Sequence, residues 1–229
     1  MPGIWEVRTS PPSLAIAVPH AAVTPLTMDW IGALVDLDKP PNTKLISWKG
    51  LPVHLARNRL AQDAISLGVK FLFFLDSDVL PPRDAIMKLM GWRVPIIAGV
   101  YWAKRGYPAI WQEDPQRPGG YIPVRDLGNV TIREVDAVGA GCMLIDVRAF
   151  KVVPFPWFEW TIEDPMIPKG LSEDLGWCRK AWEHGLKVYI DRSVECQHET
   201  VLPVNLEGQI VLGEQQSGQL ARLGQIREA

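Results

Sequence analysis

One stretch of the chain, residues 57–79, decides the fold; it reads RNRLAQDAISLGVKFLFFLDSDV. Its first part continues a run from Pro52 to Leu67 in which apolar residues recur at near-helical spacing, and Gly68 is of the type that ends helices. Its second part, Phe71–Leu75, is apolar at every position, which is typical of a strand covered on both faces. Two aspartates follow at once. The stretch therefore predicts a helix, a buried strand and an acidic turn in succession.

Strands and helices are expected to alternate on both sides of this stretch. The pattern predicts strands at Leu14–Val18, Lys44–Trp48, Ile96–Tyr101 and Lys187–Ile190, and a further buried element at Ala140–Asp146. Helices are expected from Thr24-Pro25 toward Val35, over Arg83–Met90, and from Ser172 to His184, with Thr24 and Ser172 as N-caps. Such alternation is typical of an α/β domain. The expected architecture is a mostly parallel sheet flanked by helices.

Two regions break this regularity. Residues 102–135 are rich in Gly and Pro and contain short β-like pieces, which predict a smaller mixed β region. Pro154–Pro168 (PFPWFEWTIEDPMIP) is expected to be a loop anchored by aromatic side chains. Residues 203–229 have weak amphipathicity and are interpreted as a C-terminal tail. We therefore expect one domain over residues 1–202, followed by the tail.

The bulk composition limits the classes of partner. The chain has 229 residues and a formal net charge of −2, which gives no broad basic surface for nucleic acid or an anionic membrane. No apolar run approaches the roughly 20 residues that cross a bilayer, and residues 1–10 lack the pattern of a signal peptide. Three widely spaced cysteines favour reduced thiols. These features together predict a cytoplasmic protein.

The acidic turn after the buried strand is the first candidate for chemistry. Ligands of open α/β sheets bind beyond the carboxyl ends of the strands, where Asp76-Ser77-Asp78 is expected to lie. Two carboxylates one residue apart can converge on one hard cation, and Mg²⁺ or Mn²⁺ suits oxygen ligands and bridges to phosphates. The alternative is that these aspartates only cap the helix that begins at Pro81-Pro82.

Two downstream features extend the candidate site. Glu173 and Asp174 open a helix, where negative charge also complements the helix dipole. His198 follows the last expected core strand. A carboxylate pair, a further acid and a late histidine are the groups that a metal–diphosphate transferase requires, for metal binding and for removal of the acceptor proton.

From Leu14 to His198 the sequence resembles the nucleotide-sugar glycosyltransferases of GT-A fold, especially their family 2-like members. The resemblance rests on the order and spacing of five segments. They are VPH (18–20), the stretch 57–79 quoted above, VGAGCMLIDVRAF (138–150), SEDLGWCRKAWEHGLKVYI (172–190) and CQH (196–198).

The resemblance implies a role for each matched residue. Asp76, Asp78 and His198 would hold Mn²⁺ or Mg²⁺, and Asp174 would be the general base, with Glu173 able to exchange roles with it. The donor, a UDP- or GDP-sugar, would lie near Pro19, His20, Arg57, Ser77, Gly139, Ala140 and Gly141. Arg57 would pair with Asp76 or the phosphates, and the glycines would allow close approach beside the sugar.

The expected reaction is inverting transfer of a hexosyl group to a hydroxyl acceptor that the sequence does not identify. Two other classes stay open. A nucleotidyltransferase shares a similar core and metal use, although LAIAVPHAAVTP (14–25) lacks the Gly-rich, basic signature of such enzymes. A non-catalytic module that binds nucleotide or carbohydrate would keep the fold without turnover.

Overall fold

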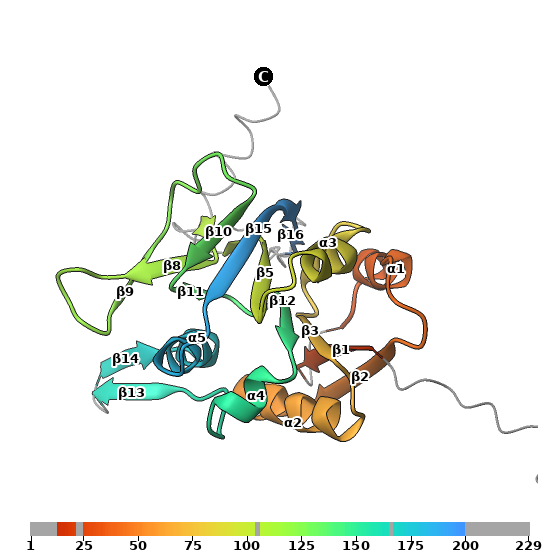
Figure 1. The fold of residues 1–229 in the computed structure, drawn as a ribbon, viewed down its shortest axis with the longest axis horizontal. Coiled ribbons are helices and arrows are strands. Elements are labelled where there is room, and N and C mark those ends of the chain that lie inside the picture. The colour runs from red at the N-terminus through yellow and green to blue at the C-terminus, as the bar shows by residue number, and fades with distance from the viewer. Residues whose placement is uncertain (1–12, 22–24, 104–105, 165–166, 200–229) are drawn as a thin grey trace, which may run out of the picture.

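A computed structural model describes residues 13–21, 25–103, 106–164 and 167–199. At its centre is a seven-stranded sheet with the order β10–β15–β5–β12–β3–β1–β2 (Figure 1). The strands are β1 (Leu14–His20), β2 (Lys44–Lys49), β3 (Phe71–Leu75), β5 (Ile96–Val100), β10 (Ile132–Val135), β12 (Cys142–Asp146) and β15 (Val188–Glu195). The α/β class and the five predicted strands are confirmed, and the buried element predicted at Ala140–Asp146 contains β12.

The sheet is mixed, which corrects the prediction of a mostly parallel sheet. The pairs β1–β2, β1–β3 and β5–β15 are parallel, whereas β12 is antiparallel to both β3 and β5, and β10 is antiparallel to β15. The chain leaves β5 at the carboxyl edge of the sheet and re-enters from that edge at Cys142, which pairs with Leu75 at the end of β3. Among the described residues of this connection no crossover helix returns the chain to the opposite edge, so β12 runs back against its neighbours.

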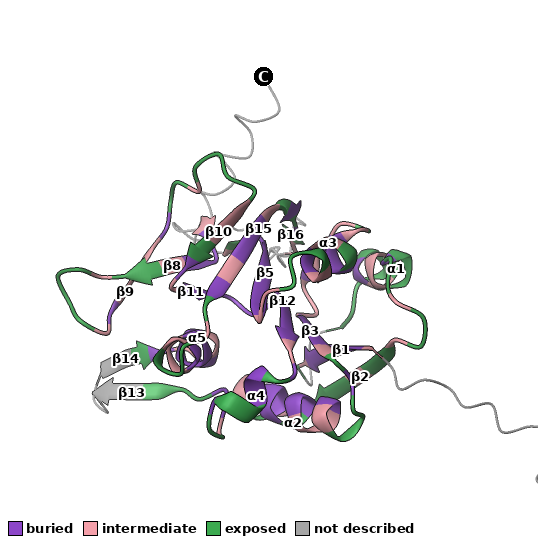
Figure 2. Ribbon diagram, in the orientation of Figure 1, coloured by how far each residue is buried: buried purple, intermediate pink, exposed green. Residues whose placement is uncertain are grey.

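Helices cover both faces of the sheet (Figure 1). One face packs against α2 (Val53–Ser66), α4 (Ala149–Val152) and α5 (Glu173–Glu183), and the other against α1 (Met28–Asp36) and α3 (Ala85–Gly91). Alternate residues of a strand serve the two cores, so that Leu72 and Phe74 face α2 while Phe73 and Leu75 face α1 and α3. Figure 2 shows the central strands as largely buried, as their continuous apolar runs predict.

Short elements surround this core. A three-stranded sheet joins β11 (Ala137–Val138), β8 (Ile110–Glu113) and β9 (Tyr121–Pro123), which confirms the predicted small β region. Two-residue strands form the pairs β4 (Val79–Leu80) with β16 (Gln197–His198) and β6 (Trp102–Ala103) with β7 (Tyr107–Pro108). The expected loop at 154–168 is partly wrong, because β13 (Thr161–Asp164) and β14 (Ile167–Leu171) form an antiparallel hairpin there. Backbone pairing supplies order that the aromatic and Pro-rich composition did not suggest.

The N-terminal ends of two helices differ from the prediction. Helix α1 begins at Met28, not at Pro25, because the Thr27 hydroxyl accepts the Trp30 N–H at 3.0 Å and so caps the helix. Ser172 occupies the N-cap of α5 as predicted, but its hydroxyl donates to the Asp174 carboxylate and makes no cap bond. The predicted tail, 203–229, lies outside the described residues. In the part of the chain that is described, no helix is long and apolar enough to cross a membrane.

Candidate active site

The acidic turn lies at the carboxyl edge of the sheet and is fixed from several sides. The Asp76 N–H donates to the Gly141 carbonyl at 3.0 Å, and the Trp30 indole donates to the Asp76 carbonyl at 2.8 Å. The N–H of Val79 closes the turn on the same Asp76 carbonyl at 3.1 Å. Helix α3 has Asp84 at its N-cap, so the alternative in which Asp76 and Asp78 cap that helix does not hold.

Arg57 is the buried cation that joins the two acidic parts of the site. Its Nη2 lies 3.0 and 3.1 Å from the two Asp76 carboxylate oxygens, and its Nε lies 3.2 Å from Glu173 Oε1. Its Nη1 donates to the Ala140 carbonyl at 3.3 Å. The Arg57 and Glu173 side chains are 3% and 5% exposed, whereas that of Asp76 is 27% exposed. The resemblance implies that Arg57 pairs with Asp76 or with the phosphates, and in the structure it pairs with Asp76.

The charges in this cluster oppose the cost of burial. Burial lowers the pKa of Arg57, but the nearby carboxylates, Asp76 first, outweigh it and raise that pKa, so the guanidinium stays charged. Burial raises the pKa of Asp76 and Arg57 opposes the rise. Burial and then Asp174 raise the pKa of Glu173, and Arg57 again opposes them. A carboxylate here is therefore stable only beside this cation.

Asp78 and His198 form a second contact at the same edge. The short strands β4 and β16 pair in a register that sets His198 opposite Val79, and this brings His198 Nε2 to 3.2 Å from Asp78 Oδ2. The other ring nitrogen, Nδ1, lies 2.8 Å from the Trp102 carbonyl oxygen. Because a carbonyl oxygen only accepts hydrogen bonds, Nδ1 carries the proton of this contact.

This tautomer sets what the pair can bind. In a neutral imidazole with its proton on Nδ1, the lone pair is on Nε2, which here lies beside the Asp78 carboxylate. Two electron-rich groups at this separation are stabilised by a cation between them, either a proton or a metal ion. Metal-binding histidines characteristically donate their second ring N–H to a carbonyl or carboxylate, as His198 does to Trp102.

The structure brings together only two of the three predicted metal ligands. Asp78 and His198 meet, whereas Asp76 is paired with Arg57. Among the described residues, no group of three or more His, Cys, Asp or Glu side chains is arranged to hold a metal ion. The chemistry of the Asp78–His198 donor set suits Mg²⁺ or Mn²⁺, which is often held by one or two protein ligands together with substrate phosphates and water. The three-ligand set remains a prediction.

The two acids at the start of α5 have different surroundings. Glu173 is buried against Arg57, as described above. Asp174 is partly exposed, and its Oδ1 accepts hydrogen bonds from the Ser172 hydroxyl and from the Leu175 N–H, the latter at 2.9 Å. Glu173 is thus committed to an ion pair, while Asp174 has the more accessible carboxylate.

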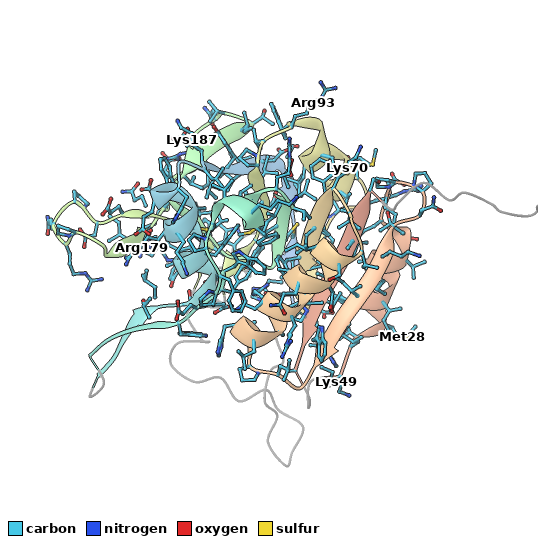
Figure 3. The ribbon with its side chains drawn as sticks, turned by 60° about the horizontal axis from the view of Figure 1, so that its bottom comes forward. Met28, Lys49, Lys70, Arg93, Arg179 and Lys187 are labelled. Carbon is cyan, nitrogen blue, oxygen red and sulfur yellow. The ribbon has the colours of Figure 1, made fainter. Side chains whose placement is uncertain are left out.

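The predicted donor-binding residues fall on the same edge. Pro19 and His20 end β1, opposite Trp48 and Lys49 of β2. Ser77 lies in the turn between the two aspartates. In Figure 3, Lys49 marks this carboxyl edge at the bottom of the view, whereas Lys70, just before β3, lies toward the opposite edge.

Gly139 and Gly141 have a packing role that the sequence did not reveal. A Cβ at Gly139 would lie far inside van der Waals contact of the Tyr101 hydroxyl, and one at Gly141 would lie 2.9 Å from Tyr101 Cζ. The Tyr101 oxygen accepts the Gly141 N–H at 3.1 Å, and the Tyr101 ring meets His198 edge-on at 5.4 Å. The glycines therefore make room for Tyr101, which in turn supports the His198 ring.

Three residues of the site were missed from the sequence. The sequence placed Tyr101 only at the end of a strand. A polar side chain at that position lies at the carboxyl edge of the sheet, and this is the one signal in the sequence that could have identified Tyr101 as part of the site. Trp102 contributes through its backbone carbonyl, and Trp30 through an indole that bonds the Asp76 backbone. Neither contact has a sequence signal, because each depends on how distant segments pack.

With this geometry established, comparison with known proteins bears on the fold. No protein-family model matches the chain, and no curated protein matches it significantly. The chain is similar to A197 from STIV, with a TM-score of 0.60 and 16% identity over 87% of this chain and 94% of that one. It is similar to S. aureus TarS, with a TM-score of 0.51 and 10% identity over 82% of this chain.

A third similar structure is that of GalNAc-T7 with UDP, GalNAc and Mn²⁺, with a TM-score of 0.50 and 12% identity over 81% of this chain. This chain spans 37% of TarS and 43% of GalNAc-T7, less than half of either. Both are glycosyltransferases, so the chain has a glycosyltransferase-like, GT-A-like fold. At these identities the likeness concerns the fold alone.

Replacement of Arg57 by methionine should destabilise the protein strongly. It would leave Asp76 and Glu173 without their buried cation, at a cost of about 3–5 kcal/mol in the free energy of unfolding near neutral pH. Without the cation, both carboxyl pKa values would rise further above their ordinary values of 3.8 and 4.5. A raised carboxyl pKa costs stability only where the group is ionised, so the loss should shrink as pH falls toward those values.

Urea unfolding of the unaltered protein and of Arg57→Met, from neutral pH down toward these two pKa values, measures the loss in the free energy of unfolding. Arg83→Met is the matched control, because its ion pair with Asp38 joins side chains that are 75% and 47% exposed and should contribute less than about 1 kcal/mol. Equal losses in the two variants would contradict a buried role for Arg57.

Substitution of Gly139 by alanine should lower the free energy of unfolding by about 1–3 kcal/mol, because the new methyl group collides with Tyr101. Adding Tyr101→Phe should recover part of this loss, since it removes the closest atom. Gly32→Ala, where nothing lies within 4 Å, should instead stabilise helix α1 by up to about 1 kcal/mol. Thermal or urea unfolding of the three variants tests this; a loss that Tyr101→Phe leaves unchanged would show that the glycine has another role.

Proposed function

We propose that this chain is a metal-dependent glycosyltransferase that moves a sugar from a UDP- or GDP-sugar to a hydroxyl acceptor with inversion. The observation that carries the proposal is the Asp78–His198 pair, in which a carboxylate oxygen and Nε2 lie 3.2 Å apart at the carboxyl edge of the sheet while Nδ1 faces the Trp102 carbonyl. The glycosyltransferase-like fold supports it at a coarser level, as does the Mn²⁺ and UDP of the GalNAc-T7 structure.

Asp78 and His198 would hold the metal, and Mn²⁺ or Mg²⁺ bound there supplies positive charge that neutralises the departing diphosphate. Arg57 keeps Asp76 turned toward α2, and the carbonyl and N–H contacts of Asp76 fix the direction of the Asp76–Asp78 turn. Pro19, His20 and Ser77 border the space for the nucleotide in this proposal, and Asp76 contacts either the ribose or the metal.

Asp174 is the proposed general base. Its carboxylate is partly exposed and accepts hydrogen bonds from the Ser172 hydroxyl and the Leu175 N–H, which orient it. Glu173 is a positioning residue here, because its ion pair with Arg57 anchors the first turn of α5. In the proposed reaction, Asp174 takes the proton of the acceptor hydroxyl, the acceptor oxygen bonds to the anomeric carbon, and the bond from that carbon to the diphosphate breaks.

Replacement of Asp78 by asparagine should abolish metal-dependent nucleotide binding. With Mn²⁺ present, UDP or GDP should raise the melting temperature of the full chain, by an amount corresponding to about 2.7 kcal/mol at a concentration 100 times the Kd. The variant should lose this stabilisation. Asp84→Asn makes the same change in an exposed ion pair with Lys88 and should keep it. A Mn²⁺-dependent shift that survives Asp78→Asn would exclude this aspartate as a ligand.

Replacement of Asp174 by asparagine should lower turnover by about 10²–10⁴-fold while Mn²⁺-dependent nucleotide binding survives. Release of nucleoside diphosphate from UDP- and GDP-sugars measures turnover, and NMR of the product anomer reports inversion. Asp38→Asn, in an exposed ion pair, is the control. Retained turnover in Asp174→Asn would remove it as the base. Mn²⁺-dependent binding without any turnover in the unaltered chain would favour the non-catalytic module.

A further inference from the structure

A pocket of about 590 Å³ lies between helix α2 and the segment 155–160 that leads into β13. Its volume falls in the range of small-molecule sites. Two aromatic side chains that line it, Phe155 and Trp160, are 59% and 51% exposed. Large rings left accessible in one concavity of a folded protein commonly mark a binding surface.

Polar side chains complete the lining of this pocket. His54, Arg59 and Gln62 come from α2, and Glu159 comes from the facing segment. Glu159 lies 3.8 Å from Lys180 of α5 and adds a carboxylate to a lining that also holds Arg59, so the pocket offers both acceptors and donors of hydrogen bonds. Aromatic faces beside a mixture of hydrogen-bond donors and acceptors match a neutral ring that has an apolar face and many hydroxyl groups, which is the chemistry of a saccharide.

The wall of the pocket is fixed before any ligand binds. The Asn58 side chain is buried, its amide donates to the Phe158 carbonyl at 2.7 Å, and its oxygen accepts from the N–H groups of Trp157 and Phe158 at 3.0 and 3.1 Å. On the other side, Lys180 of α5 donates to the Pro156 carbonyl at 2.5 Å. The segment is thus fastened to two helices, which reduces the ordering cost of binding.

The same two helices carry the proposed reaction centre. Consecutive residues of α2 serve the two sites, with Arg57 in the centre and Asn58 behind the pocket wall. In α5, a Cβ at Gly176 would lie 2.7 Å from the Glu159 carbonyl oxygen, so the pocket segment packs directly against the turn that follows Asp174. Figure 1 shows α2 and α5 on one side of the sheet, with the β13–β14 hairpin beside α5.

We infer that this pocket binds the neutral saccharide part of the acceptor and holds one of its hydroxyl groups beside Asp174. The inference rests on the proposed function, because it names the class of acceptor for that same reaction. Phe155 and Trp160 supply the stacking faces, and Gln62, His54 and Glu159 select the pattern of hydroxyl groups.

The test is ¹⁹F NMR of the full chain labelled with 5-fluorotryptophan, titrated with the methyl glycosides of glucose, galactose, mannose and N-acetylglucosamine. Trp160→Phe assigns the Trp160 resonance. That resonance should shift saturably with at least one glycoside, while the resonance of Trp92, which is bonded to Asp191, stays in place. Phe155→Ala should weaken the binding about tenfold. Met87→Ala, which removes exposed apolar surface from α3, should leave it unchanged.

Three results would overturn the inference: no glycoside shifts Trp160, the shift is as strong in Phe155→Ala, or inorganic phosphate shifts Trp160 while the glycosides do not. A Mn²⁺-dependent thermal shift with UDP or GDP, recorded on the same labelled chain, separates the two levels of the argument. If this shift persists when the glycosides fail, the pocket assignment alone is wrong. If neither the glycosides nor the Mn²⁺-dependent nucleotide shift gives a response, the proposed function is wrong as well as the pocket assignment.

Discussion

A single buried guanidinium determines how the acids of this site are arranged. Arg57 reaches from α2 to Asp76 at the end of β3 and to Glu173 at the start of α5, so three distant segments meet at one cation. Either carboxylate without that cation would be costly in this buried setting. Asp76 and Glu173, the two acids paired with Arg57, each have a second acid close by in the sequence. Of these, Asp78 lies against His198, and Asp174 accepts hydrogen bonds from Ser172 and Leu175. Arg57 therefore holds two acids of this site, and the other two, Asp78 and Asp174, have other partners.

The route of the chain after β15 brings His198 to Asp78. Strand β16 pairs with β4 directly after the acidic turn, and the Glu199 N–H donates to the Asp78 carbonyl at 2.8 Å, while the Glu199 carboxylate accepts the Thr27 hydroxyl at 2.7 Å. These bonds connect the end of the described chain to α1 and to the turn. The position of His198 is thus determined by backbone pairing, and the direction of its ring by the Trp102 carbonyl and the Tyr101 ring.

The sequence predicted the elements better than their pairing. Continuous apolar runs such as FLFFL identified the buried strands, because a strand covered on both faces has no polar positions. Strand direction has no such local signature, so β12 was not recognised as antiparallel. In the site, the order of the motifs placed Asp76, Asp78, Asp174 and His198 on one edge. The pairing of Arg57 with Glu173, the role of Gly139 and the contribution of Tyr101 depend on contacts between distant segments, which composition and spacing do not encode.

Anomalous diffraction from crystals of the full chain grown with Mn²⁺ and UDP would test the account most directly. The account predicts a manganese peak within ligand distance, roughly 2.0–2.3 Å, of the Asp78 carboxylate and of His198 Nε2. It also predicts that Arg57 remains bonded to Glu173. A manganese ion bound elsewhere, with neither Asp78 nor His198 among its ligands, would contradict it.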